Sequence, residues 1–160
     1  MRKLKIILRC ENNASCTLAE RRRIRAAVLA TLREEGVAPR CELSVLLTDA
    51  GGIRAINRAF RETDRETDVL SFPLGDINPA NGRLLLGDMV LNLDRVRAQG
   101  EELGHGYRRE LQYLTVHSVL HLLGYDHIDE GPEKAAMRAR EKIVMRSLGV
   151  PDREETEIQP

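Results

Sequence analysis

The chain has 160 residues, with 25 basic and 25 acidic side chains, so its formal net charge is zero. This length predicts one domain with a substantial core, at residues 1–151, followed by a frayed acidic tail at 152–160. The balanced charge gives no overall field that attracts nucleic acid, and no run approaches the roughly 18 apolar residues of a membrane span. Three cysteines without a Cys-x-x-Cys pair, and an N-terminal apolar run too short for a secretory signal, favour a cytoplasmic protein.

The first half of the chain predicts a strand–helix–strand–helix order. The expected elements lie at residues 4–9, 17–36, 43–48 and 49–60. Thr17 and Glu20 form a capping box at the start of the first helix, and Gly36 ends it. Asp49 caps the second helix, whose apolar side chains are expected to face the core. These side chains are Ile53, Ile56 and Phe60.

The second helix also carries arginines at helical spacing, at positions 54, 58 and 61. Arg54 and Arg58 are expected to lie on a solvent-exposed face of this helix, without a functional role. Arg61 differs because it precedes a predicted strand at 69–72, ended by Pro73. An arginine at the mouth of that strand is suited to bind a phosphate, since its guanidinium offers paired N–H donors.

Turn residues at 78–82 predict a hairpin connection to a strand at 84–91, antiparallel to the third strand. Gly87 inside this strand indicates a bulge or a close approach by another group. Asp88 is a candidate hydrogen-bond partner that orients a ligand histidine, although a contact to a backbone amide is the alternative. Further helices are expected near 93–100, at 107–123 and from Gly131-Pro132 to Gly149. His105 is expected in the loop that precedes the helix at 107–123.

The helix predicted at 107–123 carries the most informative motif. His117 and His121 stand four residues apart and therefore share one face of a helix that is apolar on nearly every side. Gly124 can end the helix in a left-handed conformation and bring His127 back to the same point. Three imidazoles without a thiolate are the ligand set of a catalytic zinc site, whose fourth position is left to water. The alternative is that His117 and His121 are hydrogen-bonded core residues and His127 is a surface histidine.

The spacing of this motif matches the metzincin proteases, but the residue after the first histidine is not their catalytic Glu. Here it is Ser118, which cannot act as a general base at neutral pH. A substrate whose own charge helps it bind the ion, such as a phosphodiester, fits this site better than a peptide does. Asp126 stands beside a ligand histidine and is a second candidate partner of the ligands.

Three blocks of sequence resemble the YbeY family of metal-dependent endoribonucleases. They are Ile56-Asn57 with Arg61 and Thr67-Asp68-Val-Leu-Ser-Phe72-Pro73, then Leu86-Gly87-Asp88, then His117 to His127. The resemblance implies an α/β (α+β) fold, with a small four-stranded mixed sheet flanked by about five helices and the metal site on a late helix.

The same resemblance implies one zinc ion on His117, His121 and His127, with Arg61 important for activity and His117 part of the catalytic site. It also implies cleavage of single-stranded RNA in the maturation of the 16S rRNA 3′ end and in ribosome quality control, with the ribosome and its assembly factors as partners. The chain departs from the family's usual residues at Ser118 (usually Gly), Phe60 (usually Tyr) and Thr63 (often Lys), and none of these is a ligand.

Two other functions remain open at this stage. A zinc peptidase is disfavoured by the missing Glu. A non-catalytic ribosome assembly factor with a structural zinc agrees with the neutral charge and the few aromatic residues available to stack bases.

Overall fold

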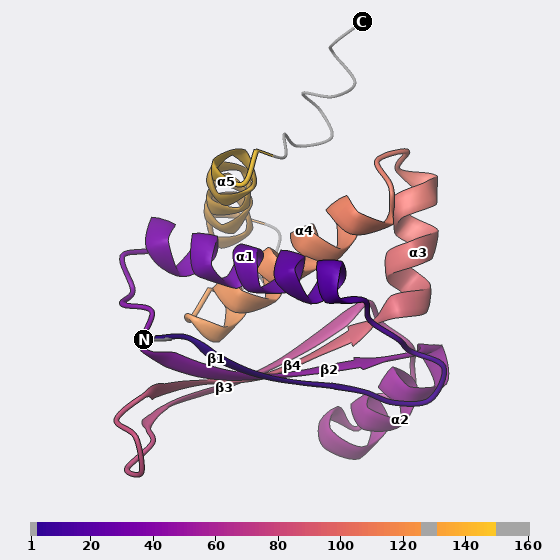
Figure 1. The fold of residues 1–160 in the computed structure, drawn as a ribbon. Helices are drawn as coiled ribbons and strands as arrows, with labels where there is room; N and C mark the ends of the chain where they lie inside the picture. The colour runs from indigo at the N-terminus through magenta and orange to yellow at the C-terminus, as the bar shows by residue number, and fades with distance from the viewer. Residues whose placement is uncertain (1–2, 126–130, 150–160) are drawn as a thin grey trace, which may run out of the picture.

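A computed structural model describes residues 3–125 and 131–149. Their elements, in chain order, are β1 (Lys5–Cys10), α1 (Leu18–Glu34), β2 (Cys41–Thr48), α2 (Ala50–Arg61), β3 (Val69–Ile77), β4 (Leu84–Asn92), α3 (Leu93–Glu102), α4 (Tyr107–Leu122) and α5 (Pro132–Ser147). The strands form one sheet in the order β1-β2-β4-β3, with β3 antiparallel to β4 and the other neighbours parallel. The predicted α/β class, with a four-stranded mixed sheet and five helices, is confirmed (Figure 1). The predicted domain end at 151 and the tail at 152–160 lie outside the described residues.

The two faces of the sheet are covered differently. Figure 1 shows α1, α4 and α5 on one side of the sheet and α2 on the other. Successive side chains of β2 alternate accordingly, since Leu43, Val45 and Leu47 are buried toward α1 and α4. Most of the core therefore lies between the sheet and the α1–α4 layer, and α2 covers only part of the opposite face.

Two helix starts agree with the sequence. Glu20 N donates to Thr17 Oγ1 over 3.1 Å and Thr17 N donates to Glu20 Oε1 over 2.8 Å, which is the predicted capping box. Gly52 N donates to Asp49 Oδ1 over 2.9 Å at the start of α2. Both caps satisfy N–H groups that the first turn of a helix leaves without an intrahelical acceptor.

The prediction that Phe60 faces the core is wrong. Ile53 is fully buried against Leu70 and Val90, and Ile56 packs beside them. Phe60, in the last turn of α2, is 74% exposed. The apolar stripe of α2 extends beyond the part of the sheet that the helix covers, and periodicity alone cannot reveal where that cover ends.

Strand β3 does not end at Pro73. It continues to Ile77, with a register shift between Pro73 and Asp76. An edge strand tolerates proline because the backbone on one of its sides forms no hydrogen bonds to a neighbouring strand. Opposite Pro73, Gly87 has a φ of 136°, and a Cβ there would lie 2.1 Å from the Phe72 carbonyl oxygen. The close approach predicted at Gly87 is therefore confirmed.

Within residues 3–125 and 131–149, no helix combines the length and the apolar character needed to cross a membrane.

Candidate active site

His117 and His121 lie on one face of α4 and are half-buried, although most of the residues around them are buried. Their Nε2 atoms are 3.2 Å apart and their ring centroids 4.7 Å apart. The helix ends directly afterwards, where Gly124 has a φ of 111°. Gly124 N donates to the His121 carbonyl over 3.0 Å and Tyr125 N to the Leu120 carbonyl over 3.1 Å. These are the two bonds of a Schellman motif, so the helix exit predicted at Gly124 is confirmed.

A buried carboxylate from α5 holds the first histidine. His117 Nδ1 lies 2.5 Å from Glu141 Oε2, and the Tyr113 hydroxyl donates to Glu141 Oε1 over 3.0 Å. Burial raises the pKa of the Tyr113 hydroxyl, and the neighbouring charge of Glu141 raises it further. A carboxylate only accepts hydrogen bonds, so Nδ1 of His117 carries the proton and Nε2 presents its lone pair toward His121.

Both histidines line a cleft of about 460 Å³ between α4 and the edge strand β3. Arg61, at the end of α2, lines the same cleft from across β3. Its Nη2 donates to the Ser71 carbonyl over 2.6 Å, and its guanidinium carbon stands 4.9 Å from the centre of the Phe72 ring. The structure therefore brings together Arg61 and the two histidines, which are 56 or more positions apart in the chain.

A sequence profile described as "Endoribonuclease YbeY" matches residues 8–149. The chain belongs to the YbeY endoribonuclease family. It is 44% identical over 132 residues to the endoribonuclease YbeY of Roseiflexus sp. (strain RS-1), covering 79% of this chain and 82% of that protein. Against the endoribonuclease YbeY of Caldanaerobacter subterraneus subsp. tengcongensis it is 45% identical over 134 residues, covering 78% and 84%.

A solved structure also resembles the fold of this YbeY family member. The solution structure of TM1509 from Thermotoga maritima matches with a TM-score of 0.56 and 22% sequence identity, over 90% of this chain and 91% of that one. At this identity the likeness concerns the fold alone.

The donor set of the YbeY site suits a metal ion. Two imidazole nitrogens about 2.0–2.1 Å from one zinc ion at a tetrahedral angle lie about 3.3 Å apart. The 3.2 Å between the two Nε2 atoms, across which the rings hydrogen-bond to each other here, is close to that value. The carboxylate on His117 Nδ1 is the arrangement that commonly orients metal-bound histidines.

The remaining ligand predictions fall on a segment that the structure does not describe. His127, the predicted third ligand, and Asp126, a predicted partner of the ligands, lie outside the described residues. Among residues 3–125 and 131–149, no group of three or more His, Cys, Asp or Glu side chains is arranged to hold a metal ion. Two of the three predicted ligands are therefore placed together.

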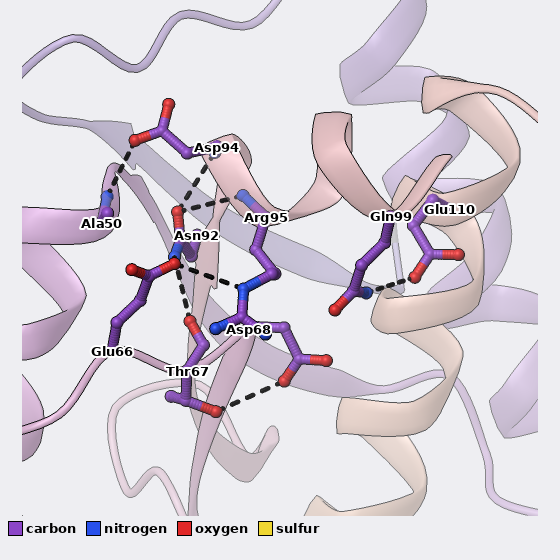
Figure 2. Close-up of polar contacts among 9 residues, drawn as sticks. All are labelled: Ala50, Glu66, Thr67, Asp68, Asn92, Asp94, Arg95, Gln99 and Glu110. Atoms are coloured by element: carbon purple, nitrogen blue, oxygen red, sulfur yellow. Dashed lines mark hydrogen bonds and ion pairs between the residues drawn. The ribbon is translucent and has the colours of Figure 1, made fainter. Parts of the chain in front are cut away.

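Asp68 also lines the cleft, and the hydroxyl of the neighbouring Thr67 donates to its Oδ1 over 3.4 Å. The fully buried Asn92 holds this segment, because its Nδ2 donates to the Thr67 carbonyl over 3.0 Å and its backbone N–H to the Asp68 carbonyl over 2.9 Å. Its Oδ1 accepts from Asp94 N and Arg95 N at the start of α3 (Figure 2). The Asn92 side chain thus caps α3 and holds Thr67, and its backbone N–H holds Asp68.

The helix exit after Gly124 is fixed as well. The Tyr125 hydroxyl donates to Glu35 Oε1 over 2.6 Å, and Arg140 Nε donates to Glu35 Oε2 over 2.6 Å. Glu35 at the end of α1 therefore joins the residue after Gly124 to α5. This arrangement holds Tyr125, the residue after the helix exit, against the end of α1.

The prediction for Asp88 is wrong. Asp88 is exposed and lines a pocket on the α2 face of the sheet, whereas His117 lies on the opposite side. The neighbouring Met89 is fully buried among the core residues, and successive strand residues point to opposite faces. The carboxylate that contacts His117 is that of Glu141.

His105 lies away from the cleft, as expected, but its side chain is only 6% exposed. Its Nε2 is 2.8 Å from Glu110 Oε1, at the joint between α3 and α4. Gln99 donates to the other oxygen of Glu110 over 2.7 Å (Figure 2). These contacts hold two helices together.

Sequence reasoning missed Glu141, although a signal was present. The buried apolar positions of α5 are Met137, Val144 and Met145, and Glu141 falls in the same stripe. A charged residue on the apolar face of a helix needs a buried partner. Asp68 was missed because its position in the cleft depends on long-range contacts to Asn92.

Proposed function

We propose that this protein is a zinc-dependent endoribonuclease that cuts single-stranded RNA. Membership of the YbeY family makes it an endoribonuclease, a hydrolase of the phosphodiester bonds of RNA. The observation that supports a metal mechanism is the meeting of His117 Nε2 and His121 Nε2 at 3.2 Å in the cleft that Arg61 also lines.

His117, His121 and His127 would hold the zinc ion. When bound, the ion supplies a Lewis acid for a phosphate oxygen and lowers the pKa of a coordinated water. An open cleft around the histidines favours a catalytic ion over a structural one, because structural zinc sites are closed by four protein ligands.

The chain's own residues bind the substrate and move protons. Arg61 binds the scissile phosphate, and its guanidinium stabilises the charge that develops there. Its hydrogen bond to the Ser71 carbonyl orients the guanidinium beside the cleft. Asp68 accepts the proton of the attacking water, since it is the one acidic residue among the described residues that line the cleft. Glu141 keeps the His117 ring in the tautomer and orientation that a metal requires.

The proposed substrate is the 3′ end of 16S rRNA, with the ribosome and its assembly factors as partners in the cytoplasm. The net charge of zero supports this assignment, because a protein without excess positive charge has little nonspecific attraction for RNA. Recognition by a ribosome-bound partner then directs the protein to this site and adds to its own affinity for single-stranded RNA.

The deciding experiment compares wild type with His117→Ala, purified by the same procedure from a nuclease-deficient host. Each is incubated with single-stranded RNA, double-stranded RNA and an unstructured protein. We expect wild type alone to cut, and to cut only the single-stranded RNA. Equal RNA cleavage by both preparations would indicate contamination and favour the assembly factor with structural zinc. Degradation of the unstructured protein would favour the peptidase.

A further inference from the structure

A second pocket, of about 450 Å³, lies on the opposite face of the sheet from the histidines. It crosses the sheet beside α2, from Arg9 on β1 to Phe72 on β3. Its walls are mainly apolar, formed by strand residues together with Ile56 and Phe60. Helices α1, α4 and α5 lie on the other side of the sheet and do not cover this face (Figure 1).

Two aromatic rings meet at one end of this pocket. The Phe60 and Phe72 rings are 6.0 Å apart at an interplanar angle of 65°. Phe60 is 74% exposed, more than any other large apolar side chain of α2 or the sheet. Arg61 is 4.9 Å from the centre of the Phe72 ring and also lines the histidine cleft. Arg61, which lines the histidine cleft, therefore contacts Phe72, which lines the second pocket, at the edge strand β3.

The chemistry of the pocket fits a nucleobase. A base presents a flat π-face that stacks on aromatic side chains and on arginine, and a polar edge that forms hydrogen bonds. Phe60 and Phe72 supply aromatic faces, and Asp88, Ser44 and Arg9 supply acceptors and donors within the same pocket. Exposed aromatics on a four-stranded sheet are a known surface for stacking unpaired RNA bases.

The location agrees with the proposed cleavage. A phosphate at Arg61 places the neighbouring nucleotide at the edge of β3, beside the Phe72 ring. Only an unpaired base can turn over this edge, since a duplex holds its bases inside the helix.

We infer that this pocket, which we name the base pocket (Ser44, Phe60, Phe72 and Asp88 with Arg9), binds an unstacked base of the RNA next to the phosphate held by Arg61. This inference rests on the proposed function and assigns it a substrate subsite. It also gives the single-strand requirement a structural cause.

The test uses the full-length protein and short single-stranded RNAs in which one abasic nucleotide is moved along the sequence. Cleavage kcat/KM is measured in zinc, and binding of intact RNA is measured by fluorescence anisotropy in chelator. The variants are Phe60→Ala, Phe60→Tyr and, as a matched control, Leu18→Ala, which removes another exposed apolar side chain (63% exposed) at the start of α1. Melting temperatures verify that each variant is folded.

Phe60→Ala is expected to reduce RNA affinity and kcat/KM roughly tenfold or more, the size of one lost stacking contact. Leu18→Ala should remain near wild type, and Phe60→Tyr, which keeps an aromatic face, should lose less affinity and kcat/KM than Phe60→Ala. For wild type, an abasic nucleotide at one position of the RNA should lower affinity and kcat/KM by a similar factor. For Phe60→Ala, the same abasic RNA should lower them little beyond the effect of the substitution itself. This non-additivity would identify the base that occupies the pocket.

Unchanged kcat/KM and affinity in Phe60→Ala would overturn the base pocket and leave the nuclease function intact. That result would favour a protein partner for this face. If wild type binds RNA without cutting it, the proposed function fails, and loss of binding in Phe60→Ala would still support the pocket. Absence of measurable RNA binding by wild type would overturn the inference.

Discussion

His117 and Glu141 join α4 to α5 through a 2.5 Å contact between Nδ1 and Oε2. Glu141 is 5% exposed, and its carboxylate also accepts a hydrogen bond from the Tyr113 hydroxyl. A buried charge with two partners fixes their positions more firmly than an exposed one, because few alternative hydrogen bonds are available to any of the three groups. The orientation of the His117 ring therefore depends on a helix that contributes no predicted metal ligand.

Replacing Glu141 with Gln should weaken zinc binding about 10- to 100-fold, the usual cost of losing a carboxylate behind a ligand histidine. Gln still accepts a hydrogen bond but no longer carries the charge that favours metal on the opposite ring nitrogen. Competition with a chromogenic chelator measures the affinity without reference to activity. Glu133→Gln, an exposed change in the first turn of the same helix, is the control. Equal affinities for the two variants would remove Glu141 from the metal site.

Arg61→Ala should leave zinc content unchanged and lower kcat/KM by about 10²- to 10³-fold, because the developing charge on the phosphate loses its guanidinium. Arg61→Lys should recover only part of the loss, since an ammonium lacks the planar pair of donors. Arg58→Ala, on the same helix, serves as the control. Full activity in Arg61→Ala would show that another group binds the phosphate.

Asp68→Asn should lower kcat by about 10²- to 10⁴-fold, the range typical for removal of a general base. KM and zinc content should change little, because the amide is close in size to the carboxylate. Single-turnover cleavage assays separate the chemical step from product release. A variant with unchanged kcat would assign proton acceptance to another group.

Zinc should raise the melting temperature of wild type and have little effect on His121→Ala. A ligand that binds only the folded state, present at 100 times its Kd, stabilises by about 2.7 kcal/mol. Differential scanning fluorimetry in chelator and in a zinc series checks this. A zinc-dependent increase of equal size in His121→Ala would indicate that the ion binds elsewhere.

Acid should destabilise the start of α2. The pKa of Asp49 lies below its ordinary value, first because the Asn12 side chain donates to it and next because Gly52 N does. A lowered folded-state pKa contributes stability above the unfolded value of about 3.9, and this is lost as the pH falls through the folded-state pKa. Asp49→Asn keeps a capping oxygen but has no charge to titrate. Urea midpoints in chelator between pH 6 and pH 3 should therefore fall less for Asp49→Asn than for wild type, and parallel curves would refute the assignment.

The histidine pair, the helix exit at Gly124 and the α/β order followed from spacing and local turn chemistry. These features depend on residues within a few positions of one another, so a sequence contains them directly. The burial of Phe60 was mispredicted because it depends on how far α2 covers the sheet. The position of Asp88 was mispredicted because it depends on which face of the sheet the side chains of a bulged strand point toward. Glu141 and Asp68 reach the site through contacts 24 residues away or more, which single-sequence periodicity does not encode.

The contact between His117 and Glu141 also has a consequence for biosynthesis. Glu141 is translated 24 residues after His117, so the ring has no carboxylate support until α5 has emerged from the ribosome. We expect a nascent chain stalled before residue 132 to form most of the sheet yet bind zinc weakly and leave nearby RNA intact. A nuclease made beside the cell's most abundant RNA would thus remain inactive until α5 had been synthesised, and stalled chains that cut RNA at the full rate would contradict this expectation.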